Sequence, residues 1–424
     1  MLSAIVGINW GDEGKGRMVD MLGSGYDVIV RYQGGNNAGH TVINDKGKFI
    51  LNLLPSGVLR DGTVNVMGNG MVIDLAHLCG EIESLEKSGV SVSPGNLKIS
   101  DKAAVCMPYH RLLDVLEEDR LGDAKQGSTR RGIAPAYADK YYRKAIRMGD
   151  LLQPGTIKKK LGPIVDWKNL TVAKGYGAEP ISAESMESWL LEHAKKLAPY
   201  IIDTGRYLDG AAASGKDILF EAQLGALRDL DFGIYPYTTS SSALAAYAPI
   251  GAGIPARRLD SVIGIMKAYS SSVGGGPFTA ELFGAEAEAL REAGAEYGAA
   301  TGRPRRVGPF DIPASKYGVS VQGADCIALT KLDVLAYMDR IPVCAAYDID
   351  GERTREFPTD DRLERAKPVL EYVEGFHEDI TKCRKPGDLP KAARAYVSYV
   401  EESVGCHIRY VAVGAEREAC VEMP

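Results

Sequence analysis

Short apolar runs alternate with helical patterns along the 424 residues of the chain. The first run, Ala4-Ile5-Val6-Gly7-Ile8, precedes a glycine-rich loop, and the apolar positions of residues 17–22 then follow helical spacing. A second run at 27–32 leads into a loop rich in glycine and asparagine. Further buried strands are predicted at 217–220, 262–266, 326–329 and 341–345. Apolar strands between helices predict an α/β fold like that of P-loop NTPases, with a large, mostly parallel central sheet covered by helices.

Helical patterns dominate residues 75–215. Ile82 and Leu85 lie three apart before a glycine, and one apolar stripe combines Met186, Trp189, Leu190, His193 and Leu197. The chain is longer than the usual domain of about 150 residues, but we find no internal repeat or low-complexity linker. We therefore expect a single elaborated domain, 1–424, with 75–215 as a mainly helical insertion within it.

Composition excludes several classes of protein. The net charge of −6 argues against a general nucleic-acid binder, which usually carries an excess of Lys and Arg. The seven cysteines are odd in number and lack the paired spacing of a zinc site or a redox dithiol. The N-terminus runs directly into a strand pattern, and no apolar run reaches about 18 residues. We expect a cytoplasmic protein without signal peptide or membrane span.

The first glycine-rich loop, Gly11–Gly16, has the order strand, loop, helix that a phosphate site requires. It is not a Walker A motif, because Gly16 stands where that motif has a metal-binding Ser or Thr. Its glycines allow backbone N–H groups to approach phosphate oxygens, and Lys15 adds a positive charge. Asp12 is then the candidate oxygen ligand for Mg²⁺. The alternative is a surface turn with a solvated Asp and Lys.

Two other motifs carry candidate nucleotide chemistry. His40 follows Gly39 in the second glycine-rich loop, which suits an acid or hydrogen-bond donor near phosphate, although a lone His is more often structural. Thr330-Lys331-Leu332-Asp333 follows an apolar strand, as does the guanine-reading motif of many GTPases. A carboxylate there accepts two N–H donors that adenine does not offer together, which favours GTP over ATP. A simple strand-end cap would explain Asp333 equally well.

Two basic segments could bind anions. Residues 301–306 place three guanidinium groups in a Gly/Pro loop, a suitable clamp for carboxylate or phosphate groups, with a solvated basic loop as the alternative. The second segment surrounds Ser128 and Thr129 and contains Arg130, Arg131, Arg143 and Lys144. Together they offer more anion-binding capacity than one nucleotide needs.

The motifs WGDEGKG, QGGNNAGHT, RGIAPAY, GIYPYTTSSS, KAYSSSVGGGPF, TGRPRR and TKLDVL occur in order between Val6 and about Gly414. With them the chain resembles the adenylosuccinate synthetase family over nearly its whole length. The resemblance implies a ligase that joins IMP to L-aspartate at the expense of GTP, with Mg²⁺. The products would be adenylosuccinate, GDP and phosphate, formed through 6-phosphoryl-IMP in the synthesis of AMP.

The resemblance also implies residue roles. Asp12 would take the proton from ring nitrogen one of IMP and bind Mg²⁺ with the Gly39 carbonyl, His40 would donate to the phosphoryl groups, and Lys15 would support the transfer. The implied IMP contacts are Asn37, Thr129, Arg143, Gln223, Thr239 and Arg303, with Arg143 reaching into the partner's site of a homodimer. The implied aspartate contacts are Thr301 and Arg303. The implied GTP contacts are Gly11, Glu13, Gly14, Lys15, Gly16, Arg305, Lys331, Asp333 and Gly414.

Several positions depart from the family pattern, but none removes a group that makes or breaks a bond. They are Arg130, Leu224, Phe232, Ala300, Pro309 and Ala412. Their effect on nucleotide or amine selectivity keeps open one alternative, a specialised paralogue acting on a different 6-oxopurine nucleotide or amine. A non-catalytic nucleotide-binding regulator is the remote alternative, because the whole acid, base and metal set is present.

Overall fold

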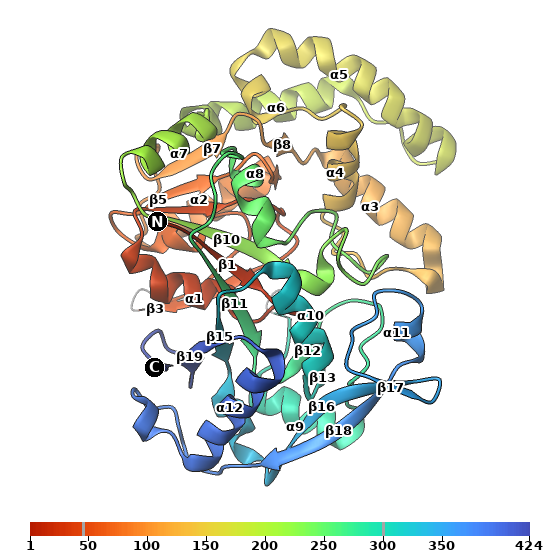
Figure 1. Ribbon diagram of the computed structural model, residues 1–424. Coiled ribbons are helices and arrows are strands. Elements are labelled where there is room, and N and C mark those ends of the chain that lie inside the picture. Colours follow the sequence, from red (N-terminus) through yellow and green to blue (C-terminus); the bar gives the residue numbers. More distant parts are fainter. Residues whose placement is uncertain (45–46, 299–301) are drawn as a thin grey trace.

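The computed structural model describes residues 1–44, 47–298 and 302–424 (Figure 1). These residues build one ten-stranded sheet in which β1 occupies a central position. The strands in spatial order are β20 (Cys420–Glu422), β19 (Ile408–Ala412), β15 (Cys326–Thr330), β11 (Ser261–Lys267), β1 (Leu2–Gly7), β10 (Ile218–Gly225), β2 (Val28–Arg31), β5 (Val64–Met67), β7 (Leu97–Ser100) and β9 (Ile201–Ile202). Neighbouring strands pair in parallel, except that β20 runs antiparallel to β19 at one edge. The predicted fold class is confirmed.

Alternate side chains of β1 face opposite sides of this sheet, as the twofold period of a strand requires. Ile5 packs in a cluster with Met18 and Val19 of the first helix, whereas Ala4 and Val6 pack in a second cluster with Leu208. The α-helices of the described chain are α1 (Lys15–Leu22), α2 (Leu75–Lys87), α3 (Pro108–Leu121), α4 (Ile133–Tyr141), α5 (Pro154–Asn169), α6 (Ala183–Leu197), α7 (Thr204–Ala213), α8 (Ala248–Ala252), α9 (Gly284–Gly294), α10 (Ile312–Gln322), α11 (Arg362–Arg365) and α12 (Lys391–Val404). Helices therefore cover both faces.

The strand predicted at 341–345 exists but belongs to a different sheet. It lies in β16 (Arg340–Ile349), which pairs with β14 (Phe310–Asp311), β17 (Glu352–Thr354) and β18 (Lys367–Glu374). An apolar run indicates that a strand is buried, but it carries no information on which strands are its neighbours. Three further pairs complete the strands: β3 (His40–Asn44) with β4 (Gly47–Leu51), β6 (Val72–Ile73) with β8 (Ala104–Val105), and β12 (Ser270–Ser272) with β13 (Arg306–Gly308).

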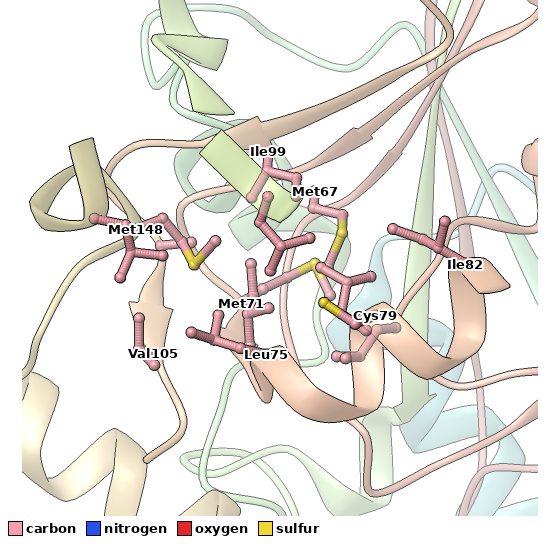
Figure 2. Packing of buried hydrophobic residues seen from close by; sticks show 14 of the residues in the cluster. Met67, Met71, Leu75, Cys79, Ile82, Ile99, Val105 and Met148 are labelled. Carbon is pink, nitrogen blue, oxygen red and sulfur yellow. The ribbon is translucent and has the colours of Figure 1, made fainter. Parts of the chain in front are cut away.

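Residues 75–215 are mainly helical and share one apolar core with the edge of the sheet. Figure 2 shows Leu75, Cys79 and Ile82 of α2 packed with Met67 and Ile99 of β5 and β7. The Asp74 carboxylate caps α2 by accepting the His77 N–H at 3.1 Å. Truncating a buried aliphatic side chain such as Ile82 to Ala costs roughly 2–5 kcal/mol, so this core holds α2 firmly against the sheet.

We propose that the chain forms a single elaborated domain. Strands β7 and β9 lie within 75–215, yet both belong to the ten-stranded sheet. A segment that contributes strands to the common sheet shares its hydrogen-bond ladder with the rest of the chain.

Among the described helices, none combines the length and the apolar character that crossing a membrane requires.

Candidate active site

The first glycine-rich loop connects β1 to α1 at the carboxyl end of the sheet, where ligands of open α/β sheets bind. Its backbone takes left-handed angles at Gly11, Asp12 and Gly14, with φ of 103°, 59° and 98°. Gly14 precedes the first residue of α1, so the unpaired N–H groups of the helix start face the loop. Asp12 adopts a conformation that a non-glycine residue rarely takes, which is a form of strain common at functional sites.

Glu13 and Lys15 form a buried ion pair inside this loop. The Glu13 Oε2 atom lies 2.5 Å from Lys15 Nζ, while Oε1 accepts the N–H groups of Gly11 at 2.8 Å and Asn9 at 3.2 Å. A methyl group on Gly7 would lie 2.6 Å from the same carboxylate, so the neighbouring strand must carry a glycine there. Glu13 thus holds the shape of the loop and the position of the Lys15 ammonium group.

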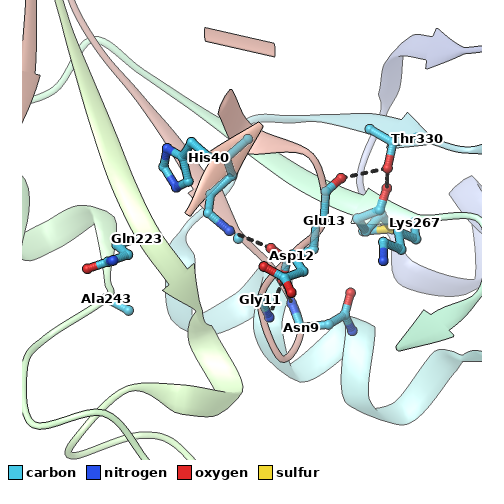
Figure 3. A network of polar contacts seen from close by, with 12 residues as sticks. Asn9, Gly11, Asp12, Glu13, His40, Gln223, Ala243, Lys267 and Thr330 are labelled. Carbon is cyan, nitrogen blue, oxygen red and sulfur yellow. Dashed lines mark hydrogen bonds and ion pairs between the residues drawn. The ribbon is translucent and has the colours of Figure 1, made fainter. Parts of the chain in front are cut away.

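Asp12 lies at the open side of the loop and pairs with Arg305. Its Oδ2 atom is 2.9 Å from Arg305 Nη2, and Arg305 Nη1 bonds Glu296 Oε2 at 2.8 Å. In Figure 3, Asp12 lies between His40 on one side and Thr330 with Lys267 on the other. Two segments that lie far apart in the sequence therefore meet at one carboxylate.

Glu296 is the centre of a buried cationic cluster. Besides Arg305, its carboxylate contacts Lys267 Nζ at 2.7 Å, Lys331 Nζ at 3.2 Å and the Tyr269 hydroxyl at 2.5 Å. Burial alone would raise the pKa of Glu296, but Lys267, Lys331 and Arg305 hold it well below its ordinary value. Burial, opposed by Glu296, lowers the pKa of Lys267 to about 8. The cluster holds Arg305, the cation that contacts Asp12, in place.

His40 begins β3 and lies against α1. A methyl group on Gly16 would approach its Cβ atom to 2.7 Å, so glycine is required for this close packing. The Nδ1 atom of His40 is 2.5 Å from Glu221 Oε1, and Nε2 hydrogen-bonds no residue that the structure describes. Burial lowers the pKa of His40 despite the opposing charge of Glu221. In the described structure, Nδ1 of the imidazole therefore hydrogen-bonds Glu221, whereas Nε2 is available to a ligand.

The second glycine-rich loop, residues 33–40, is shaped by Gln223 at the end of β10. The Gln223 side chain accepts the Gly35 N–H at 3.1 Å and donates to the Gly35 carbonyl at 3.0 Å. The Asn37 Oδ1 atom is buried and has no hydrogen-bond partner among the described residues. Asn37 thus offers a free acceptor in a loop that already has a fixed shape.

The guanine-reading motif is tied to the first loop by Thr330. Its hydroxyl donates to the Glu13 carbonyl at 2.7 Å, which places the end of β15 beside the phosphate loop. Asp333 carries a buried Oδ1 atom with no partner among the described residues, and burial raises its pKa. Such an acceptor suits the paired N–H donors of a guanine base. Gly414 follows β19, the strand next to β15 in the sheet.

Two of the basic residues predicted at 301–306 have different partners in the structure. Arg305 faces Asp12, whereas Arg306 bonds Glu281 Oε2 through Nη2 at 2.5 Å and the Gly276 carbonyl through Nη1 at 2.7 Å. Consecutive side chains of a strand point to opposite faces, and Arg306 begins β13. Arg303 is exposed, and Thr301 and Ala300 lie outside the described residues. Arg305 and Arg306 therefore face different partners, and the assignment of Arg303 and Arg305 to substrates stays a prediction.

The predicted IMP residues of the second basic segment lie on the surface. Thr129 is exposed between α3 and α4, and Arg143 is exposed just after α4 with a left-handed φ of 62°. The Thr239 N–H, in contrast, donates to the carbonyl of buried Arg228 at 2.8 Å. Thr129 and Arg143 are thus available to a ligand or to another protein surface.

Two buried carboxylates, Glu221 and Glu296, have no counterpart among the sequence predictions. Each contacts a predicted site residue, Glu221 through His40 and Glu296 through Arg305 and Lys331. A charged residue that ends the apolar strand at 218–220 was the available signal for Glu221. Glu296 lies in the irregular segment that follows α9. No local sequence pattern there indicates a buried carboxylate.

The donor set around Asp12 fits a hard divalent cation that is shared with a substrate. No group of three His, Cys, Asp or Glu side chains suited to metal binding occurs in the described part of the chain. Mg²⁺ commonly takes one or two carboxylates and completes its shell with water and substrate phosphates. Asp12, with its partly exposed carboxylate, and the carbonyl of Gly39, which precedes His40 in the second loop, could provide such an incomplete protein shell.

Comparison with known proteins gives a consistent result. Residues 4–421 match the family model described as adenylosuccinate synthetase. Curated adenylosuccinate synthetases from Parafrankia sp. (strain EAN1pec) and Thermobifida fusca (strain YX) are 47% and 46% identical, covering 97% and 99% of this chain and 96% and 98% of their own lengths. The solved structure of the fully ligated adenylosuccinate synthetase from Plasmodium falciparum matches with a TM-score of 0.93 and 36% identity, covering 100% of this chain and 99% of that one. Given these matches and the geometry of its loops, the chain belongs to the adenylosuccinate synthetase family.

Proposed function

We propose that the chain ligates IMP and L-aspartate to adenylosuccinate, with GTP converted to GDP and phosphate, in the synthesis of AMP. The observation that carries this proposal is the meeting of Asp12, His40 and the Thr330–Asp333 motif around the loop that follows β1. A base, an acid and a guanine-reading carboxylate at one sheet edge are the groups that this reaction needs.

The first step would make the 6-oxygen of IMP into a leaving group. The Asp12 carboxylate takes the proton from ring nitrogen one, so that the 6-oxygen attacks the γ-phosphorus of GTP. The new P–O bond forms while the bond from the γ-phosphorus to the β-phosphate oxygen breaks, which releases GDP and leaves 6-phosphoryl-IMP. His40 donates to the phosphoryl oxygens from Nε2, and Lys15 compensates their charge. We assign magnesium to Asp12 and the Gly39 carbonyl, where it would neutralise phosphate charge.

The second step would replace the phosphate by the amine of aspartate. The amine attacks carbon six, the C–N bond forms, and the C–O bond to phosphate breaks with loss of a proton from the amine. We assign aspartate binding to Thr301 and Arg303, where Arg303 also contacts IMP. Arg305 is paired with Asp12, and its approach to anionic substrates would release the Asp12 carboxylate for the first step.

The two nucleotides would occupy opposite sides of Asp12. Asn37, Gln223, Thr239, Thr129 and Arg143 are assigned to IMP. The GTP assignment combines the first loop with the motif at the end of β15, and its members are Gly11, Glu13, Gly14, Lys15, Gly16, Arg305, Lys331, Asp333 and Gly414. The unpartnered Asp333 oxygen supports guanine over adenine, because adenine would leave one lone pair facing a ring nitrogen without a proton.

We further propose a cytoplasmic homodimer in which Arg143 reaches the partner's site. The exposed guanidinium has no partner among the described residues, and the neighbouring Tyr141 and Tyr142 are 70% and 66% exposed. Exposed aromatic side chains beside a cation suit a protein interface. All seven cysteines are free thiols, which supports a reducing compartment. Sedimentation equilibrium should give twice the chain mass of 45.6 kDa.

Product identification tests the function directly. Purified protein with IMP, aspartate, GTP and a magnesium salt should give adenylosuccinate, GDP and phosphate, identified by mass spectrometry. A panel of other 6-oxopurine nucleotides and amines addresses the specialised paralogue. A solved cyanophage S-2L structure, named succinoaminodeoxyadenylate synthetase, shares the fold with this chain at a TM-score of 0.62 but only 18% identity. Faster reaction of any panel member than of IMP and aspartate would contradict the proposal.

A further inference from the structure

Glu221 is a fully buried carboxylate that contacts the catalytic candidate His40. It ends the apolar run of β10, where the parallel neighbours are β1 and β2. Its Oε1 atom lies 2.5 Å from His40 Nδ1, and a carboxylate can only accept, so the proton between them belongs to the imidazole nitrogen. This fixes the tautomer of His40, with Nδ1 protonated and Nε2 directed away from Glu221.

The carboxylate is itself held rigidly. Ser56 donates its N–H to Oε2 at 2.8 Å and its hydroxyl to Oε1 at 2.5 Å. Arg31 lies fully buried nearby, with Nη1 donating to the Asn52 carbonyl at 2.8 Å and with Nε and Nη2 unpartnered among the described residues. Burial alone would raise the pKa of Glu221, but His40, Arg31 and Ser56 hold it below its usual range. Glu221 is therefore an anion with a fixed direction.

We propose that Glu221 is a positioning residue for the phosphoryl-transfer step, acting through His40. With Nδ1–H committed to Glu221, only Nε2 can meet the phosphoryl groups. The carboxylate makes that nitrogen more basic, so that Nε2 can hold the proton that it shares with a phosphoryl oxygen. The hydrogen bond also stops the ring from rotating, so the donor is aimed before the substrates bind. The inference rests on the proposed function, because it concerns the same site.

A purely structural role for Glu221 is the competing explanation, and Glu81 provides a matched control. Glu81 is also a buried carboxylate, it accepts the N–H groups of Asn52 and Leu53 at 2.9 and 3.0 Å, and it lies near Arg31. It has no contact with His40 in the described structure. Loss of the Glu81 charge should disturb the same region without releasing the imidazole.

The test is a double-mutant cycle between Glu221→Gln and His40→Asn, with initial rates of adenylosuccinate formation. Glu221→Gln should lower kcat about 100-fold, in the range of acid–base catalysis, with KM values for IMP and GTP within about threefold of wild type. In the His40→Asn background the same change should cost less than about threefold. Glu81→Gln should leave kcat within about threefold. Additive losses in the cycle, or an equal kcat loss in Glu81→Gln, would overturn the proposal.

A spectroscopic measurement separates this inference from the proposed function. In long-range ¹H–¹⁵N spectra, the His40 signal, assigned by its loss in His40→Asn, should show a protonated Nδ1 in wild type and a mixed tautomer in Glu221→Gln. An unchanged tautomer would contradict the inference even if the enzyme is a synthetase. If wild type makes no adenylosuccinate, the proposed function fails, and the tautomer alone decides the role of Glu221. Glu221→Asp, which retains the charge on a shorter side chain, replaces Glu221→Gln if that variant does not fold.

Discussion

The site contains two buried carboxylates that serve opposite electrostatic purposes. Glu221 contacts one imidazole and the two donors of Ser56, on the side of the sheet formed by β10 and β2. Glu296 contacts Lys267, Arg305 and Lys331, on the side formed by β11 and β15. Asp12 lies in the loop after β1, between these sides, and among the described residues it pairs with Arg305 of the second side.

The difference indicates how the protein prepares for substrates of high negative charge. The Glu296 cluster holds three cations near one anion, so it carries surplus positive charge before any phosphate or carboxylate arrives. The Glu221 cluster has little charge to offer and contributes direction instead. Variants in the Glu296 cluster should therefore affect stability and anion binding, whereas variants around Glu221 should affect the rate of the chemical step.

Asp12→Asn should have the largest effect, because this residue belongs to neither cluster and combines the two roles that we propose for it, base and metal ligand. We expect turnover to fall by more than about 10³-fold, since the amide can neither take the proton from IMP nor bind a cation as a carboxylate does. GTP binding, measured by isothermal titration calorimetry, should persist through the Asp333 side of the site. Near wild-type turnover would refute the assignment of Asp12 as base.

Glu296→Gln should give the largest loss of stability. Removing the buried anion leaves three cations facing one another, and breaking a buried ion pair costs about 3–5 kcal/mol. Urea unfolding should show this loss in the free energy of unfolding, and the KM for GTP should rise because Arg305 loses its support. Glu292→Gln is the matched control, since Glu292 lies four residues earlier in an exposed position and bonds Tyr297. Equal stability of the two variants would contradict the role of the cluster.

The pH dependence of the free energy of unfolding tests whether the cluster holds Glu296 in its ionised form. The pKa of Glu296 is depressed in the folded state, so the unfolded chain binds the proton first as the pH falls below about 4.5. Wild type should then lose stability more steeply than Glu296→Gln, by up to about 1.4 kcal/mol per pH unit. The stability difference between the two proteins should shrink as acid is added. A constant difference between pH 5 and pH 3, measured by urea unfolding, would show that Glu296 is not held ionised.

The sequence predicts those elements whose signals lie within a few neighbouring residues. Residues 4–22 show this for β1, the first glycine-rich loop and α1. An apolar run predicts the strand, glycines predict the loop, and the spacing of apolar residues predicts the helix. The same local signals predict β2, β10, β11 and β15. They cannot assign β16 to its sheet, because strand neighbours depend on pairing across distant segments.

The site contacts that escaped prediction span long distances in the sequence. Asp12 meets Arg305, and His40 meets Glu221, and neither pairing has a local pattern. The direction of Arg306 toward Glu281 follows from the alternation of a short strand, which the loop composition of residues 301–306 does not indicate. The motifs therefore identify which residues gather at the site, while the tertiary fold decides which carboxylate each cation faces.

Ser56→Ala should have the smallest effect and gives the finest test of the comparison. The change removes the hydroxyl that donates to Glu221 Oε1, but the Ser56 N–H bond to Oε2 at 2.8 Å remains. Losing one hydrogen bond to a charged group costs about 1.5–3 kcal/mol of stability at most, and less when the acceptor keeps other donors. Because His40 still occupies Oε1, we expect kcat to fall by less than about threefold in steady-state assays. A loss as large as that of Glu221→Gln would mean that the serine hydroxyl, and not the fixed carboxylate, sets the direction of the imidazole.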